Sequence, residues 1–349
     1  MDMQTFNKHI VQKDETLKSV AVLYGLCADD LKFFHNNQCE VEDMILIEIT
    51  RQIELFIPRT SVTDTSKLVN FGSGNRLVFQ PENSFSKYGV TINIENGTRK
   101  NELKYETSVR WLKTENNLHF FEIDRISKLF LNEEEVNEIA DLLAYKTSKV
   151  LYPLQVSVDE AGKFNDIENT SVFKQRWAEV KEEVYKEYDG ETVDEYCLTI
   201  EELLNEPDTL RLFLKNDYFT RTLFFGVYQS FGQVFKIEGI ESFPLVNNAV
   251  EPNYKMELEI DPLKDEYNLI NIKGNGTLHD ERSRCDFING APFSSIVKED
   301  PVMNKEGSFR IQYYLNGKTS LPESLYLECD IMLQERKKIS VVVACIDEK

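Results

Sequence analysis

The chain has 349 residues, 22 Phe, 15 Tyr and a formal net charge of −20 at pH 7. Its apolar content is enough to build the cores of two or three domains. An acidic surface repels nucleic acid and anionic membranes, so we expect neither as a partner. The charge favours either a basic protein partner or simply a solvated acidic surface.

The N-terminal sequence MDMQTFNKHI has no basic stretch followed by an apolar core, so no secretory signal is predicted. No apolar run approaches the roughly 20 residues that span a bilayer. The six cysteines form no CxxC pair, which is typical of reduced thiols, and we expect no disulfide between Cys27 and Cys39. These features predict a cytoplasmic protein.

The N-terminal segment predicts a strand, two helices and a second strand. The first strand is expected at FNKHIV (6–11), and the polar turn after it offers Asp14 or Thr16 as a helix cap. A second helix is expected at ADDLKFFH (28–35), where acidic residues lie near its positive end. Alternating apolar residues in IELFIP (53–58) predict the closing strand.

These residues resemble the LysM domain family. The matching stretches HIVQKDETL, SVAVLYGL, DDLKFFHNN and IELFIP follow one another in the family's order within residues 6–58. The resemblance implies a small βααβ module that binds N-acetylglucosamine-containing glycans in a shallow groove between the loop after the first strand and the loop before the last. By this resemblance, the groove is lined by Lys13, Asp14, Glu15, Thr16, Asp43, Met44, Ile45 and Leu46.

Both groove loops depart from the family pattern. Asp14 stands where the family has glycine, HNNQCE (35–40) replaces an Asn-Pro, and ITRQ (49–52) replaces Pro-Gly-Gln. Acidic residues beside the apolar run MILI (44–47) make an unusual platform for a sugar. Two interpretations follow: retained glycan binding, or a LysM-shaped scaffold that contacts protein.

After the LysM-like module (1–58) and a Ser- and Thr-rich linker (59–69), residues 70–349 predict a larger α+β domain, which can be one unit or two subdomains. Alternating apolar residues predict strands on both sides of a central helical block, and Asn96-Gly97 predicts a hairpin turn. Strands that flank helices favour an antiparallel sheet with the helices on one face.

The central block contains several amphipathic segments. Helices are expected at 132–150 with Asn132 as the cap, at 170–188, at 199–206 and at 208–231, with a β-hairpin at 151–169. The aromatic stretch NDYFTRTLFFGVYQSF (216–231) has two interpretations, a partner surface or a buried helix, and the buried helix is the simpler one.

No catalytic, metal or cofactor motif is found. His9, His35, His119 and His279 share no metal-ligand spacing. The glycine-rich stretches FGSGNRL (71–77) and KGNGTL (273–278) do not continue into a phosphate loop and predict turns. We therefore expect no catalytic residue, no metal ligand and no cofactor. Two carboxylates brought together only by folding would leave no such motif in the sequence.

Three functions are compatible with these features. The first is a non-enzymatic adaptor, because LysM-like modules without a signal peptide resemble those of contractile injection machines, including type VI secretion systems and their relatives in Bacteroidota. That resemblance implies docking to a spike, tail or effector protein and association with a secretion apparatus. The second is a peptidoglycan-binding protein exported by another route, and the third is a cell-wall hydrolase. The altered loops and the missing signal and catalytic motifs favour the adaptor.

Overall fold

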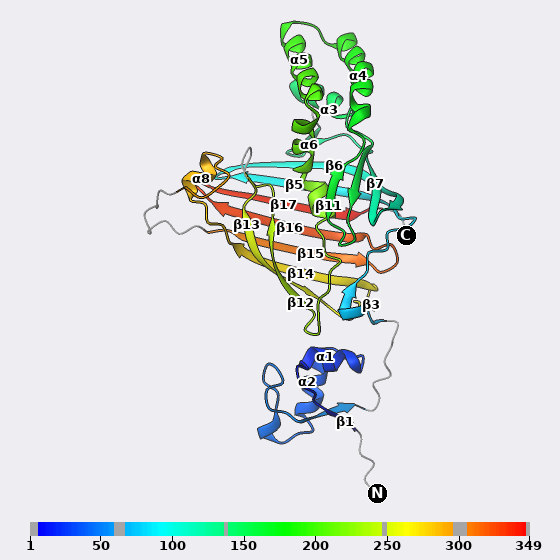
Figure 1. Ribbon diagram of the computed structural model, residues 1–349, viewed down its shortest axis with the longest axis vertical. Coiled ribbons are helices and arrows are strands. Elements are labelled where there is room, and N and C mark those ends of the chain that lie inside the picture. The colour runs from blue at the N-terminus through cyan, green and yellow to red at the C-terminus, as the bar shows by residue number, and fades with distance from the viewer. Residues whose placement is uncertain (1–5, 59–66, 136–138, 246–249, 296–305, 347–349) are drawn as a thin grey trace.

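The computed structural model describes residues 6–58, 67–135, 139–245, 250–295 and 306–346. Figure 1 shows three tiers along its longest axis: a small N-terminal unit, a broad sheet, and a group of helices beyond the sheet. We call residues 6–58 the N-terminal unit and the described residues from 67 onward the body. Most of the predicted linker, residues 59–66, lies outside the described residues.

The N-terminal unit has the order strand, helix, helix, strand. It contains β1 (Phe6–Ile10), α1 (Leu17–Leu23), α2 (Ala28–Asn36), the 3-10 helix η1 (Val41–Asp43) and β2 (Glu54–Pro58). β1 and β2 pair antiparallel, with His9 opposite Leu55. Their side chains and those of the two helices enclose a small core of Leu17, Val20, Ala21, Leu31, Ile45, Leu55 and Ile57.

The body combines helices with one large antiparallel sheet. This confirms the predicted α+β class with an antiparallel sheet. The sheet order is β11-β10-β7-β6-β5-β17-β16-β15-β14-β13-β12, so β11 and β12 are its two edges. The early strands are β5 (Phe85–Asn96), β6 (Arg99–Glu115), β7 (Leu118–Arg125), β8 (Phe130–Leu131), β9 (Glu134–Glu135), β10 (Leu154–Val158) and β11 (Phe164–Ile167). The late strands are β12 (Lys236–Ser242), β13 (Asn253–Ile260), β14 (Leu269–Leu278), β15 (Ser308–Asn316), β16 (Pro322–Met332) and β17 (Arg336–Cys345).

The sheet joins the segments before and after the helical block. β5 pairs with β17, with Val90 opposite Val343, although the two strands lie at opposite ends of the chain. The predicted turn at Asn96-Gly97 connects β5 and β6, and Gly97 has the positive φ of 60° that such a turn needs. The alternation of apolar residues therefore predicted these strands correctly, because one face of each is buried.

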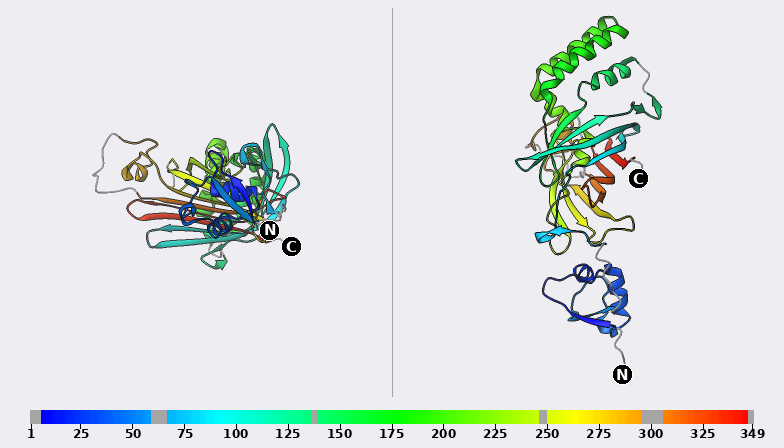
Figure 2. Two further views of the ribbon diagram at one scale, coloured as in Figure 1. Left: turned by 90° about the horizontal axis from the view of Figure 1, so that it is seen from below. Right: turned by 90° about the vertical axis from the view of Figure 1, so that its right-hand side faces the viewer.

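The sheet curls so strongly that its two edges approach each other. Lys163, which precedes β11, forms an ion pair with Glu241 of β12 at 2.7 Å. Inside the curl, α7 (Tyr218–Leu223) packs against the central strands β16 and β17, and it is followed by an irregular segment that buries Phe224, Phe225 and Phe231. The interior of the curved sheet, whose curl can be followed in Figure 2, is thus filled by the protein's own aromatic side chains.

The aromatic stretch 216–231 is buried as expected, but only its first part is helical. The predicted helix 208–231 splits into α6 (Pro207–Lys215) and α7, because Asp217 caps a new helix through Thr220 N. Beyond α7 the backbone bonds to other segments, with Phe224 O accepting from Phe164 N and Tyr228 N donating to Ala161 O. These bonds replace helical ones.

Three more helices, α3 (Ile139–Ser148), α4 (Phe173–Glu187) and α5 (Glu191–Asn205), stand with α6 beyond the sheet in Figure 1, and the short helix α8 (Arg284–Ile288) follows β14. The expectation that the helical block covers one face of the sheet is met by α7, which packs against β16 and β17, but not by α3 to α6. Asn132 does not cap α3. It has a φ of 52° in the turn between β8 and β9, and residues 136–138 lie outside the described residues.

A strap at the start of the body closes one end of the sheet. It contains β3 (Phe71–Gly72), the 3-10 helix η3 (Ser73–Asn75) and β4 (Arg76–Leu77). Residues predicted as the end of the linker already belong to it, because Val69 is buried and Val69 N donates to Pro262 O. Along the described part of the chain, no helix has the length and apolarity to cross a membrane.

Candidate functional site

The structure brings the two loops of the predicted groove together at the start of α1. Glu48, from the loop before β2, accepts a hydrogen bond from Leu17 N at 2.5 Å. The same carboxylate oxygen accepts from Ile49 N at 2.8 Å. A helix N-terminus carries free N–H donors and partial positive charge, and here the protein's own carboxylate occupies part of it.

The loop after β1 is held in a single conformation by its own residues. Asp14 has a φ of 69°, in the left-handed region where the LysM pattern has glycine, and aspartate is one of the residues that tolerate it. Thr16 caps α1 in a reciprocal box with Ser19, with Ser19 N donating to Thr16 Oγ1 at 3.1 Å and Thr16 N donating to Ser19 Oγ at 2.9 Å.

A Glu–His–Tyr contact lies beneath this loop. Glu15 Oε2 accepts from Gln12 N at 2.7 Å and lies 2.8 Å from His9 Nε2, while His9 Nδ1 lies 3.0 Å from the Tyr24 hydroxyl. Partial burial opposes ionisation of Glu15, but the bonds from Gln12 and His9 outweigh it and lower the pKa of that carboxyl. Both nitrogens of the His9 ring have a partner, so the cluster serves to fix the loop.

The loop before β2 is anchored by side chains of α2. Asn36 Nδ2 donates to Ile45 O at 2.9 Å, and Ile45 N donates to Asn36 Oδ1 at 2.8 Å. His35 Nδ1 accepts from Phe56 N at 3.1 Å, which leaves Nε2 to donate to Asp43 O at 3.1 Å and fixes the neutral tautomer. These bonds turn the Ile45 side chain into the core.

With Ile45 inside, its neighbours face outward. Val41 is 81% exposed, Leu46 82% and Ile47 88%, and Met44 is also on the surface. Glu42 and Asp43 are exposed between them. We call residues 41–47 the apolar loop, since it presents several large aliphatic side chains to solvent beside acidic ones.

The eight residues assigned by resemblance fall into three groups. Lys13, Asp14, Asp43, Met44 and Leu46 are exposed, Glu15 and Thr16 are bonded within the first loop, and Ile45 belongs to the core. Sequence reasoning missed Glu48, because no local pattern marks a carboxylate that caps a helix 31 positions earlier in the chain. That these eight residues take part in binding stays a prediction.

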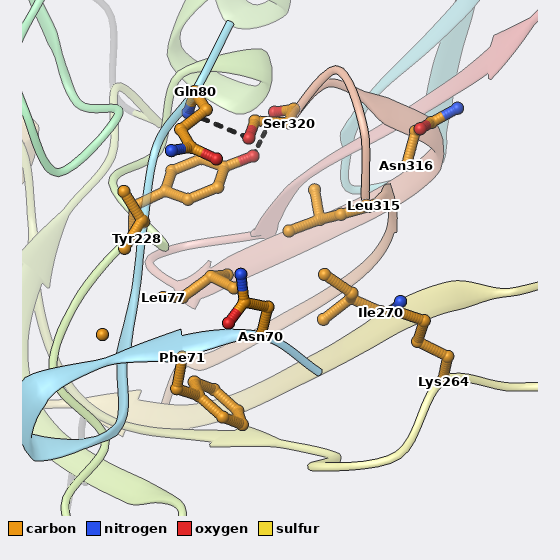
Figure 3. A pocket seen from close by; sticks show the side chains of 13 residues that line it. Asn70, Phe71, Leu77, Gln80, Tyr228, Lys264, Ile270, Leu315, Asn316 and Ser320 are labelled. Carbon is orange, nitrogen blue, oxygen red and sulfur yellow. Dashed lines mark hydrogen bonds between the residues drawn. The ribbon is translucent and has the colours of Figure 1, made fainter. Parts of the chain in front are cut away.

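A second candidate is the cavity of about 180 Å³ between the strap and the ends of β14 and β15 (Figure 3). Ser320 links its walls, with Gln80 N donating to Ser320 Oγ at 3.0 Å and Tyr228 donating to Ser320 O. Its floor is apolar, formed by Leu77, Ile270 and Leu315. Burial raises the pKa of Tyr228, so this hydroxyl acts as a hydrogen-bond donor and not as a base. The cavity has the size for a water cluster or a very small polar molecule.

No family model matches the sequence, and no curated protein matches it. Among solved structures, a chain described as "Lipid-protein interactions in lipovitellin" is similar at a TM-score of 0.38 and 13% identity, over 77% of this chain and 25% of that one. This chain thus spans about a quarter of the lipovitellin chain, and the similarity at this TM-score supports no functional argument.

Proposed function

We propose that the protein is a non-enzymatic adaptor whose N-terminal unit docks onto another protein. The observation that carries the proposal is the apolar loop, where Val41, Leu46 and Ile47 are almost fully exposed although the segment is firmly anchored through Ile45. A fixed, exposed aliphatic cluster with polar neighbours is the usual composition of a protein contact surface.

Glycan binding is the second candidate, supported by the LysM resemblance. A sugar groove relies on a few convergent polar groups, including backbone N–H donors. Between these two loops, the donor at Leu17 is already bonded to Glu48, and Glu15 and Thr16 are engaged within their own loop. The geometry therefore favours protein over glycan as the occupant.

The setting of the adaptor rests on the sequence resemblance alone. That resemblance points to a contractile injection apparatus of the type VI secretion kind, with a spike, tail or effector protein as the partner. A cytoplasmic location and an acidic surface of net charge −20 suit a partner with a basic surface.

The test uses the full chain tagged at its C-terminus, recovered from its host with its bound proteins. Replacing Leu46 and Ile47 together by Ser should abolish co-purification of the partner. The matched control is Phe33→Ser, which removes an exposed apolar side chain from α2 of the same unit, outside the apolar loop. This control should retain the partner.

A peptidoglycan sedimentation assay runs beside it. Sedimentation of the full chain with peptidoglycan, lost on addition of N-acetylglucosamine oligomers, would replace the adaptor proposal by the glycan one. Equal partner recovery by the loop variant and the wild-type chain would also overturn the assignment.

A further inference from the structure

Within the part of the chain that the structure describes, one edge of the large sheet, β12, has no strand beyond it, and the direction of its backbone groups follows from the register. Ile260 N donates to Phe235 O, so residue 235 faces the neighbouring strand β13. In an antiparallel pair the backbone direction alternates along the strand, so the even-numbered residues of β12 point their N–H and C=O groups away from β13. The bond from Lys236 N to Phe231 O and that from Arg221 to Ser242 O have this outward direction.

The bonds at Lys236 and Ser242 close the two ends of the edge, and the middle stays open. Within the described residues, the backbone groups of Glu238 and Ile240 on this side form no hydrogen bond with another segment. Glu238 and Ile240 are both exposed, and Gly239 between them has open space where a side chain would stand. An open edge of this kind is a template for one more strand.

A cavity of about 590 Å³ adjoins this edge on the outer face of the sheet. Three large apolar side chains line it and remain exposed: Ile240 at 59%, Val250 at 51% and Phe293 at 81%. Exposed Glu281 stands at the same cavity. A strand added to β12 would place alternate side chains on this face, next to Ile240.

The walls of the cavity are tied together by a buried ion pair. The side chains of Arg282 and Asp280 are each 4% exposed, and Arg282 Nη2 lies 2.8 Å from Asp280 Oδ2. Arg282 also donates to Val250 O at 2.8 Å and to Ala291 O at 3.4 Å, so one guanidinium joins three segments that line the cavity. These charge-assisted hydrogen bonds hold the segments around the cavity in fixed positions, so the shape of the cavity is defined by the fold.

We propose that β12 is a docking site for an extended peptide segment of a protein partner, which pairs with Glu238 and Ile240 and places an apolar side chain in the adjoining cavity. Main-chain hydrogen bonds give affinity in this mode, and the pocket for alternate side chains gives specificity. An aromatic residue in the partner strand is favoured opposite Gly239, because aromatic side chains cover glycines on edge strands.

Charge selects the kind of segment. The chain carries a net charge of −20, so a segment with Lys or Arg is attracted. A second copy of this acidic chain is repelled at long range, and pairing of β12 with itself is disfavoured for that reason. The proposal is independent of the apolar loop, since the two surfaces lie in different parts of the molecule (Figure 1).

The test starts with a displayed library of random heptapeptides selected on the full chain, followed by synthesis of the enriched peptides. We expect enrichment of basic residues together with aromatic or β-branched ones. Ile240→Pro removes an N–H that β13 does not use, so it should leave the sheet intact and weaken peptide binding at least about tenfold. The matched control Ile240→Thr retains the N–H and should bind within about threefold.

A peptide-side variant separates strand addition from simple charge attraction. N-methylation of alternate backbone amides leaves the charge and side chains unchanged but removes the hydrogen bonds, and it should abolish binding even if Ile240→Pro fails to fold. Equal binding of the methylated peptide, equal binding to the proline variant, failure to enrich any peptide, or a concentration-dependent dimer of the chain that excludes the peptides would each overturn the proposal.

Discussion

The N-terminal unit and the body are stabilised in different ways. The unit has a core of a few aliphatic side chains around Leu31 and Ile45, and its loops depend on single polar side chains that bond to the backbone. The body has a continuous core under a sheet whose backbone ladders are long and regular. A small core contributes little stability, so the polar anchors of the unit carry a larger share of it.

This difference predicts where each region is sensitive. In the body, we expect the buried ion pair of Arg282 and Asp280 to be the most sensitive polar feature. Substitutions of exposed residues usually change the free energy of unfolding only slightly, whereas the loss of a buried charged partner changes it strongly. In the unit, the vulnerable features are the side chains that hold the apolar loop, since side chains such as those of Asn36 and Gln52 bond its backbone groups where a strand would have ladder partners.

The largest effect is expected from Arg282→Ala in the body. It removes the guanidinium from the buried carboxylate of Asp280, which keeps hydrogen bonds from Asn253 N and from the backbone N–H of residue 282 but loses its charged partner, and breaking such a pair typically costs about 3–5 kcal/mol. The free energy of unfolding in urea measures this. Arg110→Ala is the matched control, because that arginine is 57% exposed in its pair with Glu122 and such pairs contribute about 0–1 kcal/mol. Equal losses in the two variants would contradict the expectation.

A smaller effect, confined to the N-terminal unit, is expected from Asn36→Ala. The N–H and C=O groups of Ile45 lose their partner, which costs about 1–3 kcal/mol. Hydrogen exchange should accelerate in the loop and in the β1–β2 ladder, while the β14–β16 ladders keep their protection. The exposed neighbour Asn37→Ala serves as the control. Loss of protection in both regions together would show that the two cores unfold as one.

The sequence predicted many of the strands and helices of both regions, but not the bounds of every helix and not the contacts between distant segments. The helix expected at 199–206 already begins at Glu191, and the one expected at 208–231 is divided. Alternation predicted β13 and β15 because one face of each strand is buried, and Thr16 was rightly among the candidate caps of α1. The run MILI has no periodicity, so nothing in it shows that Ile45 alone turns inward. The Asn132 prediction was wrong because asparagine favours both helix caps and left-handed turns.

The sequence of β12 alone also does not predict that this strand lies at an edge of the sheet. Its sequence KIEGIES is compatible with a central or an edge strand, and only the order of the whole sheet decides. The same holds for Glu48 and for Lys18, whose partners lie far away in the chain. Long-range contacts follow from packing, which the pattern of a single sequence does not specify.

A modest effect is expected at the contact between the two regions. Lys18 Nζ donates to Glu259 Oε1 at 2.8 Å and to Ile260 O at 3.0 Å, and it lies 6.0 Å from the centre of the Phe235 ring. Lys18→Ala should therefore loosen the N-terminal unit from the body without unfolding either, which small-angle scattering would record as an increased maximum dimension. Lys32→Ala, on α2 and paired with Asp29, is the control and should leave the dimension unchanged.

The smallest expected effect is the pH dependence of this same contact. Burial opposes ionisation of Glu259, but the bond from Lys18 and the charges of Lys18, Lys273 and Lys236 outweigh it, so its pKa in the folded protein lies below the ordinary value of 4.5. A carboxyl with a lowered pKa stabilises the contact fully above that ordinary value and loses the contribution as the pH falls through the folded-state pKa. Scattering at a series of pH values should show a constant dimension from pH 7 to about pH 5 and an expansion at more acidic pH.

Glu259→Gln identifies the group responsible for that expansion. The amide keeps a hydrogen-bond acceptor for Lys18 but has no charge to lose, so the contact should be weaker at neutral pH and should show no further change on acidification until the body itself unfolds. If the variant expanded over the same pH range as the wild-type chain, another carboxylate would control the contact. The weak ion pair of Lys18 would then be a consequence of the placement of the two regions and not its cause.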